Sequence, residues 1–66
     1  MRIKAQDGKI YETHNLEINM CVIKCKDLKD KRKKVILGRY GDLERTCEVV
    51  AEVVSCKTGY FEMPLN

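Results

Sequence analysis

The sequence predicts a small α+β protein: an antiparallel β-sheet of four to five strands with one α-helix packed on a face, in the order β-β-β-β-α-β. Three observations lead to this fold class. Short runs of alternating polar and apolar residues fill the first half of the chain, residues 42–57 have a helical period, and the 66 residues suffice for one domain only, 1–66. A chain of this length buries only about 60% of the surface that its unfolded form exposes, so we expect marginal stability.

The first two strands form a predicted hairpin. Arg2–Ala5 alternates polar and apolar residues, and Asp7-Gly8 is a strong signal for a tight turn. Residues 9–13 then return as the second strand, and His14-Asn15 connects it to the next one.

The run Leu16–Lys26 predicts a third, longer strand whose two faces are both apolar over its centre. A single helix covers only one face of a small sheet, so a second copy of the chain is the simplest cover for the other face. This pattern predicts a homo-oligomer. The alternative is a bulge near Asn19 that switches the alternation and leaves a monomer.

The second half of the chain predicts a hairpin, a helix and a last strand. Residues 26–34 form a polar turn, and 34–40 form a fourth strand. Asp42 is a good N-cap for a helix over 42–57, and Gly59 suits its C-cap. The residues that follow the helical rhythm on its apolar face are Leu43, Cys47, Val50 and Val54. A short strand over 60–63 precedes Pro64.

The sequence indicates a cytoplasmic protein with no cofactor. No run reaches the roughly 18 apolar residues that cross a bilayer, and no apolar segment of a secretory signal follows the basic start. The four cysteines lack the paired knuckle spacing of zinc sites, since three residues separate the first two and eight the last two. We therefore interpret them as small buried or half-buried apolar side chains, with metal binding as the alternative.

Catalysis has little support in the residues. His14 is the one histidine, and no nucleophile, phosphate loop or metal-binding helix motif accompanies it. The row Glu44, Glu48 and Glu52 is typical of a solvated helix face. The sequence predicts a protein that is not an enzyme.

The positive charge is concentrated on one predicted hairpin. The chain carries a formal net charge of +3, whereas residues 24–34 hold seven Lys or Arg against two Asp, a net +5 that leaves −2 for the rest. Lys31, Arg32, Lys33 and Lys34 at the tip are candidate contacts to phosphate or to a partner. The alternative is a solubilising turn that protects sheet edges from pairing.

A second candidate site lies where the fourth strand meets the helix. Arg39, Tyr40 and Arg45 surround a helix N-terminus, where unpaired N–H groups attract anions. Arg2 is a further candidate for phosphate contact, because arginine forks onto phosphate oxygens. Aromatic side chains that could form a wall for a ligand, or simply the core, are Tyr11, Tyr60 and Phe61.

Three short motifs, in order, resemble small proteins of phages and prophages of Gram-positive bacteria. These motifs are the opening Arg2-Ile3-Lys4-Ala5-Gln6-Asp7-Gly8, the middle Leu37-Gly38-Arg39-Tyr40 followed by Glu44-Arg45, and the closing Phe61-Glu62-Met63-Pro64. The similarity spans nearly the whole chain and lies near the Thoeris anti-defence signal sponges. The chain differs from the pattern in its richness in Cys and in Thr46, where Ala is usual.

The resemblance implies a protein that counters bacterial immunity. In the first of three alternatives, the protein is a homo-oligomer that sequesters an anionic nucleotide second messenger, of the cyclic ADP-ribose or cyclic oligonucleotide type, at an oligomer interface. The second is an anti-CRISPR-like inhibitor that binds a host protein or nucleic-acid complex through the basic hairpin. The third is a structural or assembly factor without a ligand. None of the three involves a membrane.

Overall fold

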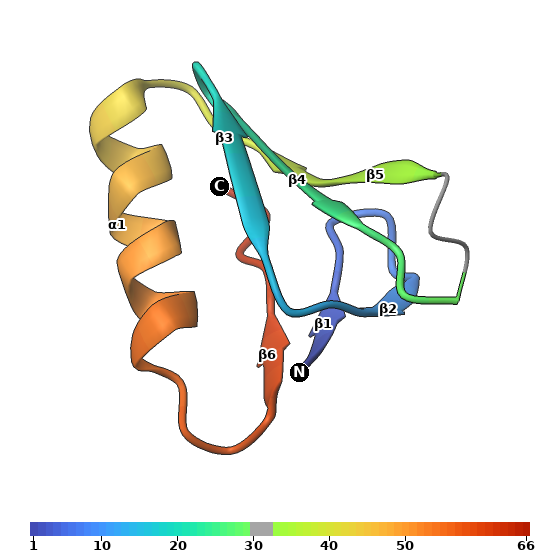
Figure 1. Ribbon diagram of the computed structural model, residues 1–66. Coiled ribbons are helices and arrows are strands. Elements are labelled where there is room, and N and C mark those ends of the chain that lie inside the picture. The colour runs from blue at the N-terminus through green and yellow to red at the C-terminus, as the bar shows by residue number, and fades with distance from the viewer. Residues whose placement is uncertain (30–32) are drawn as a thin grey trace.

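The fold is α+β, as predicted, with six strands and one helix over the residues that the computed structural model describes, 1–29 and 33–66 (Figure 1). In chain order the elements are β1 (Arg2–Lys4), β2 (Ile10–Glu12), β3 (Leu16–Asn19), β4 (Val22–Lys26), β5 (Lys34–Arg39), α1 (Leu43–Ser55) and β6 (Tyr60–Glu62).

The strands form two three-stranded sheets rather than the single antiparallel sheet that the pattern predicted. One sheet has the order β2-β1-β6 and the other β3-β4-β5. In the first sheet β6 pairs with β1 in parallel, Ile3 opposite Phe61. Helix α1 is the reason, because it carries the chain back along the molecule and lets β6 start beside Arg2 and run in the direction of β1.

The first hairpin is confirmed. β1 and β2 pair antiparallel around the turn at Asp7-Gly8, where Gly8 has φ +88°. The carboxylate of Asp7 accepts a hydrogen bond from the Lys9 N–H at 2.9 Å, a typical turn contact.

The prediction of one strand over Leu16–Lys26 is wrong. A two-residue turn at Met20-Cys21 divides this segment into β3 and β4, which pair with Asn19 opposite Val22. The reversal places Ile18 of β3 opposite Ile23 of β4, so both residues lie on the same side of the sheet. The argument for an oligomer from one strand with two apolar faces therefore no longer holds. Met20 has φ +56°, a conformation that favours glycine, and no glycine marked the turn in the sequence.

Helix α1 begins as predicted and ends earlier. The Asp42 carboxylate accepts a hydrogen bond from the Arg45 N–H at 2.7 Å, which makes Asp42 the N-cap. The last helical residue is Ser55, and Cys56 is the extended C-cap. Gly59, the expected C-cap, instead makes the turn into β6 with φ +80°.

The buried face of α1 differs from the prediction. Thr46, Val49 and Val53 are buried, whereas Leu43 and Val54 expose 56% and 76% of their surface. Thr46 can be buried because its hydroxyl donates to the Asp42 carbonyl oxygen at 2.8 Å. The helix therefore has two adjacent apolar stripes, and the one predicted to be buried lies largely in solvent.

The core lies between the two sheets and the helix. Its buried apolar residues are Ile3, Ala5, Ile23, Cys25, Val35, Leu37, Tyr40, Val49, Val53 and Met63. Of the four free cysteines, Cys25 is buried and Cys21 and Cys56 are half-buried, as expected, but Cys47 is exposed on the solvent stripe of α1. Within the described residues, no helix has the length and apolar character to cross a membrane.

Candidate anion-binding face

Basic side chains line the outer face of the sheet β3-β4-β5. Alternate residues of a strand point to opposite faces, so buried Ile23 and Cys25 place Lys24 and Lys26 of β4 on the outer face. Lys34 pairs with Lys26 and Ile36 pairs with Lys24, which brings β5 onto the same face. We call Lys24, Lys26, Lys34 and Arg39 the basic face.

A β-bulge brings Arg39 to this face. The register between β4 and β5 shifts between Ile23 and Lys24, so that β5 has an extra residue there. Leu37 and Gly38 are both buried in consequence, and Arg39 lies opposite Val22 with its side chain exposed. Without the bulge the alternation would carry Arg39 to the core side.

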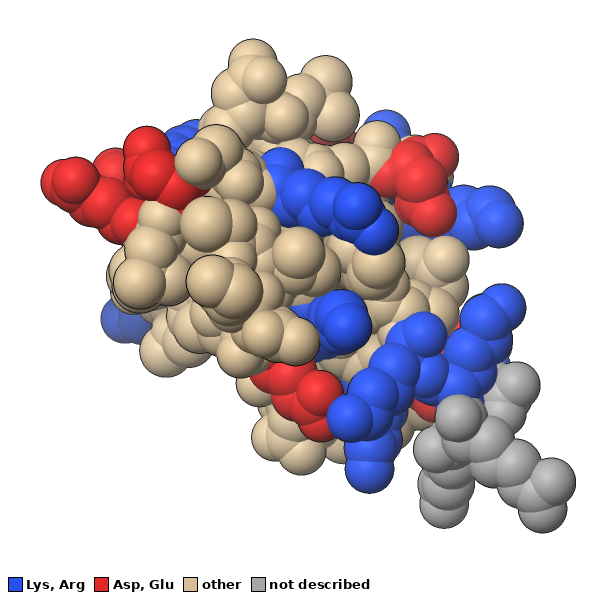
Figure 2. Space-filling model, turned by 90° about the horizontal axis from the view of Figure 1, so that it is seen from above, with Lys and Arg blue, Asp and Glu red and all other residues tan. Residues whose placement is uncertain are grey.

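The charges of this face are largely unbalanced. Its one acidic residue in the described strands is Glu17 of β3, whose carboxylate lies 3.1 Å from the Lys34 Nζ. Both side chains of this ion pair are about half exposed, so its contribution to stability is small. Figure 2 shows most of the visible basic side chains away from the helix, with some acidic ones between them, while other acidic side chains project at the left, helix end.

Part of the predicted basic hairpin adjoins this face. Lys33 is exposed just before β5, and its carbonyl oxygen accepts a hydrogen bond from the Asp27 N–H at 3.2 Å, which closes the hairpin. The predicted contacts Lys31 and Arg32 lie outside the described residues. The sequence prediction omitted Lys24 and Lys26 from the candidate site, although their alternation with buried Ile23 and Cys25 was a usable signal.

The side chain of Tyr40 is part of the core and is not open to a ligand. Its side chain is buried, and its hydroxyl donates to the Pro64 carbonyl oxygen at 2.9 Å. Burial raises the pKa of this hydroxyl above its ordinary value. A buried ring with a satisfied hydroxyl has no face left for a ligand.

Gln6 organises the region around Tyr40, and the sequence did not single it out. Its Oε1 accepts from the Arg39 N–H at 2.8 Å, and its Nε2 lies within 3.2 Å of the carbonyl oxygens of Arg39, Pro64 and Leu65. One side chain thereby ties the end of β5 to the segment after β6. We call Gln6, Gly38, Tyr40 and Pro64 the glutamine junction.

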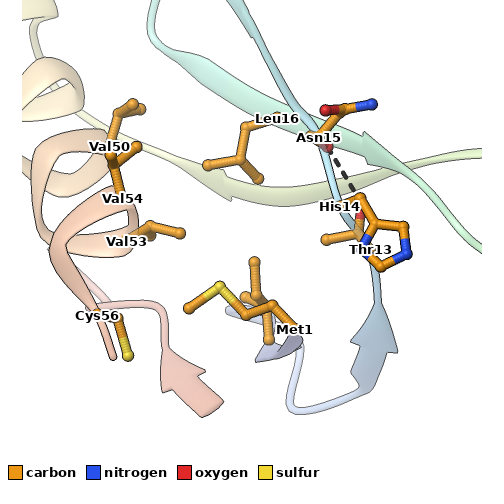
Figure 3. A pocket seen from close by; sticks show the side chains of 10 residues that line it. Met1, Thr13, His14, Asn15, Leu16, Val50, Val53, Val54 and Cys56 are labelled. Atoms are coloured by element: carbon orange, nitrogen blue, oxygen red, sulfur yellow. Dashed lines mark hydrogen bonds between the residues drawn. The ribbon is translucent and has the colours of Figure 1, made fainter. Parts of the chain in front are cut away.

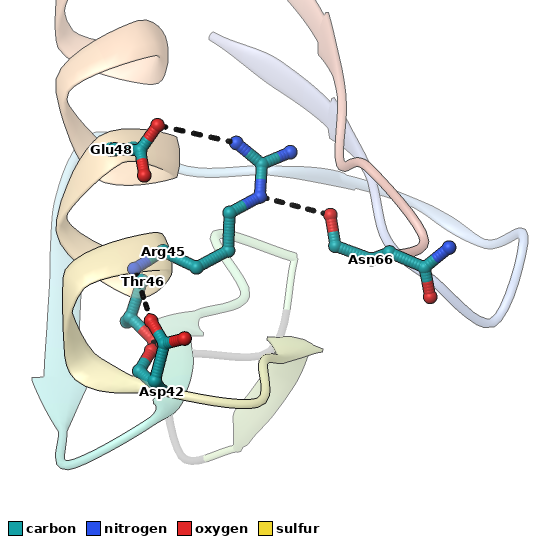
Figure 4. A network of polar contacts seen from close by, with 5 residues as sticks. All are labelled: Asp42, Arg45, Thr46, Glu48 and Asn66. Carbon is teal, nitrogen blue, oxygen red and sulfur yellow. Dashed lines mark hydrogen bonds and ion pairs between the residues drawn. The ribbon is translucent and has the colours of Figure 1, made fainter.

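Arg45 and the helix N-terminus are also engaged within the chain (Figure 4). The Arg45 Nε donates to the main-chain oxygen of Asn66 at 3.0 Å, and its Nη1 lies 3.9 Å from a Glu48 carboxylate oxygen. The Asp42 carboxylate already accepts the Arg45 N–H. The protein's own anion therefore occupies the position where an external anion would sit.

Arg2 lies on the other sheet. Its guanidinium carbon is 6.0 Å from the centroid of the Tyr60 ring, a cation–π contact between β1 and β6. Tyr11 and Phe61 pack against the core, so they form no aromatic wall. Of the predicted contacts that the structure describes, Lys34 and Arg39 lie on the same sheet face at opposite ends of β5, whereas Arg2, Tyr40 and Arg45 are not on that face.

A pocket of about 420 Å³ lies elsewhere, between α1 and the strands β1 and β3 (Figure 3). Its lining is mainly apolar and includes Leu16, Val50 and Val54, with His14 at one side. Such a lining does not suit a multiply charged nucleotide, because burying an unpaired charge is costly. No group of three or more metal-ligating side chains occurs among the described residues.

Comparison of the chain with known protein families, with curated proteins and with solved structures gives no match. The candidate function therefore depends on the geometry and charge of the basic face.

Proposed function

We propose that this protein is a non-catalytic binding protein whose basic face holds a polyanion, with the sugar–phosphate backbone of a nucleic acid as the ligand. The observation that carries the proposal is the gathering of Lys24, Lys26, Lys34 and Arg39 on one sheet face, where Glu17 is the acidic residue within the described strands. Cations that neutralise phosphates release condensed counterions, which supplies most of the affinity of sequence-independent binding.

The chemistry of the face favours backbone contacts over base recognition. Three of its four cations are lysines, which act as point charges without the fork geometry that reads guanine. The other outward residues of β4 and β5 in the described chain are the aliphatic Val22 and Ile36, so no aromatic ring is offered for base stacking. We therefore expect little preference between sequences.

The resemblance to phage and prophage proteins supports a biological setting for this binding. A small cytoplasmic protein that covers phosphates can block access of a host nucleic-acid complex, which is the anti-CRISPR-like alternative. The sequestration of a nucleotide second messenger stays a prediction. Within one copy its candidate residues are dispersed, since Tyr40 is buried and Arg2 lies on the other sheet.

The test is a salt titration of binding to fluorescein-labelled DNA and RNA oligonucleotides, followed by fluorescence anisotropy. If the four cations of the face each neutralise a phosphate, the logarithm of the association constant falls with the logarithm of salt concentration with a slope of about −3 to −4 per copy of the chain on a DNA duplex. The double variant Lys24→Glu/Lys26→Glu should lose this binding at moderate salt.

A matched control comes from lysines outside the face. Lys9 and Lys57 are both exposed, so Lys9→Glu/Lys57→Glu changes the net charge by the same amount. The control should keep most of the affinity, whereas Arg39→Ala should reduce the magnitude of the slope by about 0.9. Equal losses in both double variants, or no binding by the unchanged protein at low salt, would overturn the proposal.

A further inference from the structure

One margin of the sheet β3-β4-β5 has an open strand edge. β3 pairs with β4 only, and three of its four residues are exposed. The two-residue turn makes Asn19 and Val22 a hydrogen-bonded pair, so Ile18 and Ile23 form the next, non-hydrogen-bonded pair. The N–H and C=O of Ile18 therefore point away from β4, where another strand can pair with them.

An apolar surface lies beside this edge. Ile18 is on the same side of the sheet as fully buried Ile23 and yet exposes 46% of its surface. Across the pocket of about 420 Å³, Val54 of α1 faces Leu16 of β3 and is itself 76% exposed (Figure 3). Leu43 and Cys47 continue the exposed stripe of Val54 along the helix. An open edge and an uncovered apolar groove thus adjoin one another.

Most charged side chains of the described residues lie away from this margin. The basic face is on the opposite side of the sheet, and Glu44, Glu48 and Glu52 follow a different stripe of the helix from Val54. The acidic residue within β3 is Glu17, whose carboxylate is paired with Lys34. Two copies that meet here bring few like charges together, provided that Glu17 does not face itself.

We propose that a second copy of this chain covers the margin, with β3 antiparallel to β3 about a two-fold axis at Ile18. In this register Ile18 faces the same residue across the axis, and Glu17 faces the partner's Asn19 instead of a carboxylate. The margin is self-complementary, because each copy provides both the strand that is added and the apolar groove beside it. These are the requirements of an isologous interface.

The dimer would contain one six-stranded sheet with both helices on one side. Opposed residues of antiparallel strands lie on the same face, so the two basic faces would form one continuous surface on the other side. This consequence depends on the proposed polyanion binding, whereas the dimer itself does not. In the dimer the salt dependence of nucleic-acid binding would be about twice as steep as in a monomer.

The experiment is sedimentation equilibrium over a range of protein concentrations without nucleic acid. The unchanged protein should have twice its monomer mass of 7.7 kDa at high concentration. Ile18→Lys and Val54→Lys should each yield monomers, because a charge would be buried at the margin. The matched control is Ile10→Lys: Ile10 is 54% exposed on β2 of the other sheet, and this variant should stay dimeric.

Circular dichroism on each variant establishes that the fold is retained. Monomeric unchanged protein at every concentration overturns the interface, as does a dimer that survives both Ile18→Lys and Val54→Lys or one that is lost in Ile10→Lys. A separate result tests the proposed polyanion binding. A dimer that binds no oligonucleotide overturns the proposed function and leaves the interface, whereas a monomer that binds through Lys24 does the reverse.

Discussion

The glutamine junction and the basic face both contain polar residues, but these residues have opposite roles. At the junction Gln6 and Tyr40 direct every polar group toward carbonyls and N–H groups of the chain. On the basic face half-buried Lys24 and exposed Lys26 lie on the side of the sheet away from the core, and among the described residues neither forms an ion pair. Residue type alone does not separate a structural polar group from a binding one; the difference is whether the chain itself satisfies it.

Arg39 belongs to both regions. Its main-chain N–H and carbonyl are bound by Gln6, while its side chain lies on the basic face. Changes at the junction should therefore alter the free energy of unfolding, and changes of the Arg39 side chain should alter binding.

The largest effect is expected from Gln6→Ala. The change removes four hydrogen bonds and leaves main-chain groups of Arg39 and Leu65 without their side-chain partner, while the Pro64 carbonyl keeps the Tyr40 hydroxyl; it should lower the free energy of unfolding by about 2–3 kcal/mol. Urea denaturation of the two proteins measures the loss. Arg39→Ala, which keeps the bound main chain, should remain within about 0.5 kcal/mol of the unchanged protein. A larger effect of Arg39→Ala than of Gln6→Ala would contradict the division into two regions.

Gly38→Ala should be the next most damaging. A Cβ at this position would lie 3.0 Å from the Tyr40 hydroxyl oxygen and 3.2 Å from the Gln6 Cδ, so the junction would have to shift. We expect a loss of about 1–3 kcal/mol by the same denaturation measurement. Gly41→Ala is the control, because no atom lies within 4 Å of the added carbon there. If the two alanine variants were equally stable, the junction would not be tightly packed.

Met20→Gly should stabilise the protein by about 0.5–1 kcal/mol. Met20 is 80% exposed and has φ +56°, so the change relieves backbone strain and removes little packing. Thermal unfolding of the unchanged protein, Met20→Gly and Met20→Ala measures the effect. The alanine variant should show no gain, since alanine keeps the strained φ, and a gain of equal size would refute the explanation.

A smaller effect is expected at alkaline pH. Burial raises the pKa of the Cys25 thiol and of the Tyr40 hydroxyl above their ordinary values of 9.0 and 10.0. The folded protein then binds these protons more tightly than the unfolded chain, so stability should fall as pH rises above about 9. Cys56 acts in the opposite sense below that pH, because its hydrogen bond with Thr58 lowers the pKa of its thiol.

Denaturation midpoints from neutral to alkaline pH, for the unchanged protein and for Tyr40→Phe, measure this dependence. The phenylalanine variant should lose stability less steeply above about pH 10, although it starts lower because it lacks the hydrogen bond to Pro64. An identical slope in both proteins would exclude Tyr40 as a cause.

Local signals in the sequence were sufficient where a few neighbouring residues determine the conformation. Asp7-Gly8 predicted its hairpin because glycine adopts a positive φ at no steric cost, and Asp42 predicted the start of α1 because its carboxylate reaches the Arg45 N–H. The excess of lysine over 24–34 predicted a basic hairpin tip, of which Lys31 and Arg32 lie outside the described residues.

Other features depended on contacts between distant segments. The helix has two adjacent apolar stripes, and only packing against the sheets decided that Val49 is buried and Val54 exposed. The strain at Met20 is tolerated because the strands on both sides pair, and no neighbouring residue in the sequence predicted it.

By itself, the sequence determined the α+β class, the first hairpin, the helix N-terminus and the position of the excess positive charge. Only the tertiary structure decided that Tyr40 is part of the core, that β6 pairs with β1, and that a bulge places Arg39 on the same sheet face as Lys24 and Lys34. The physical reason is the separation along the chain of the residues that decide each feature. Turns and caps are satisfied within three or four residues, whereas the face that a side chain occupies depends on which distant strands cover the other side.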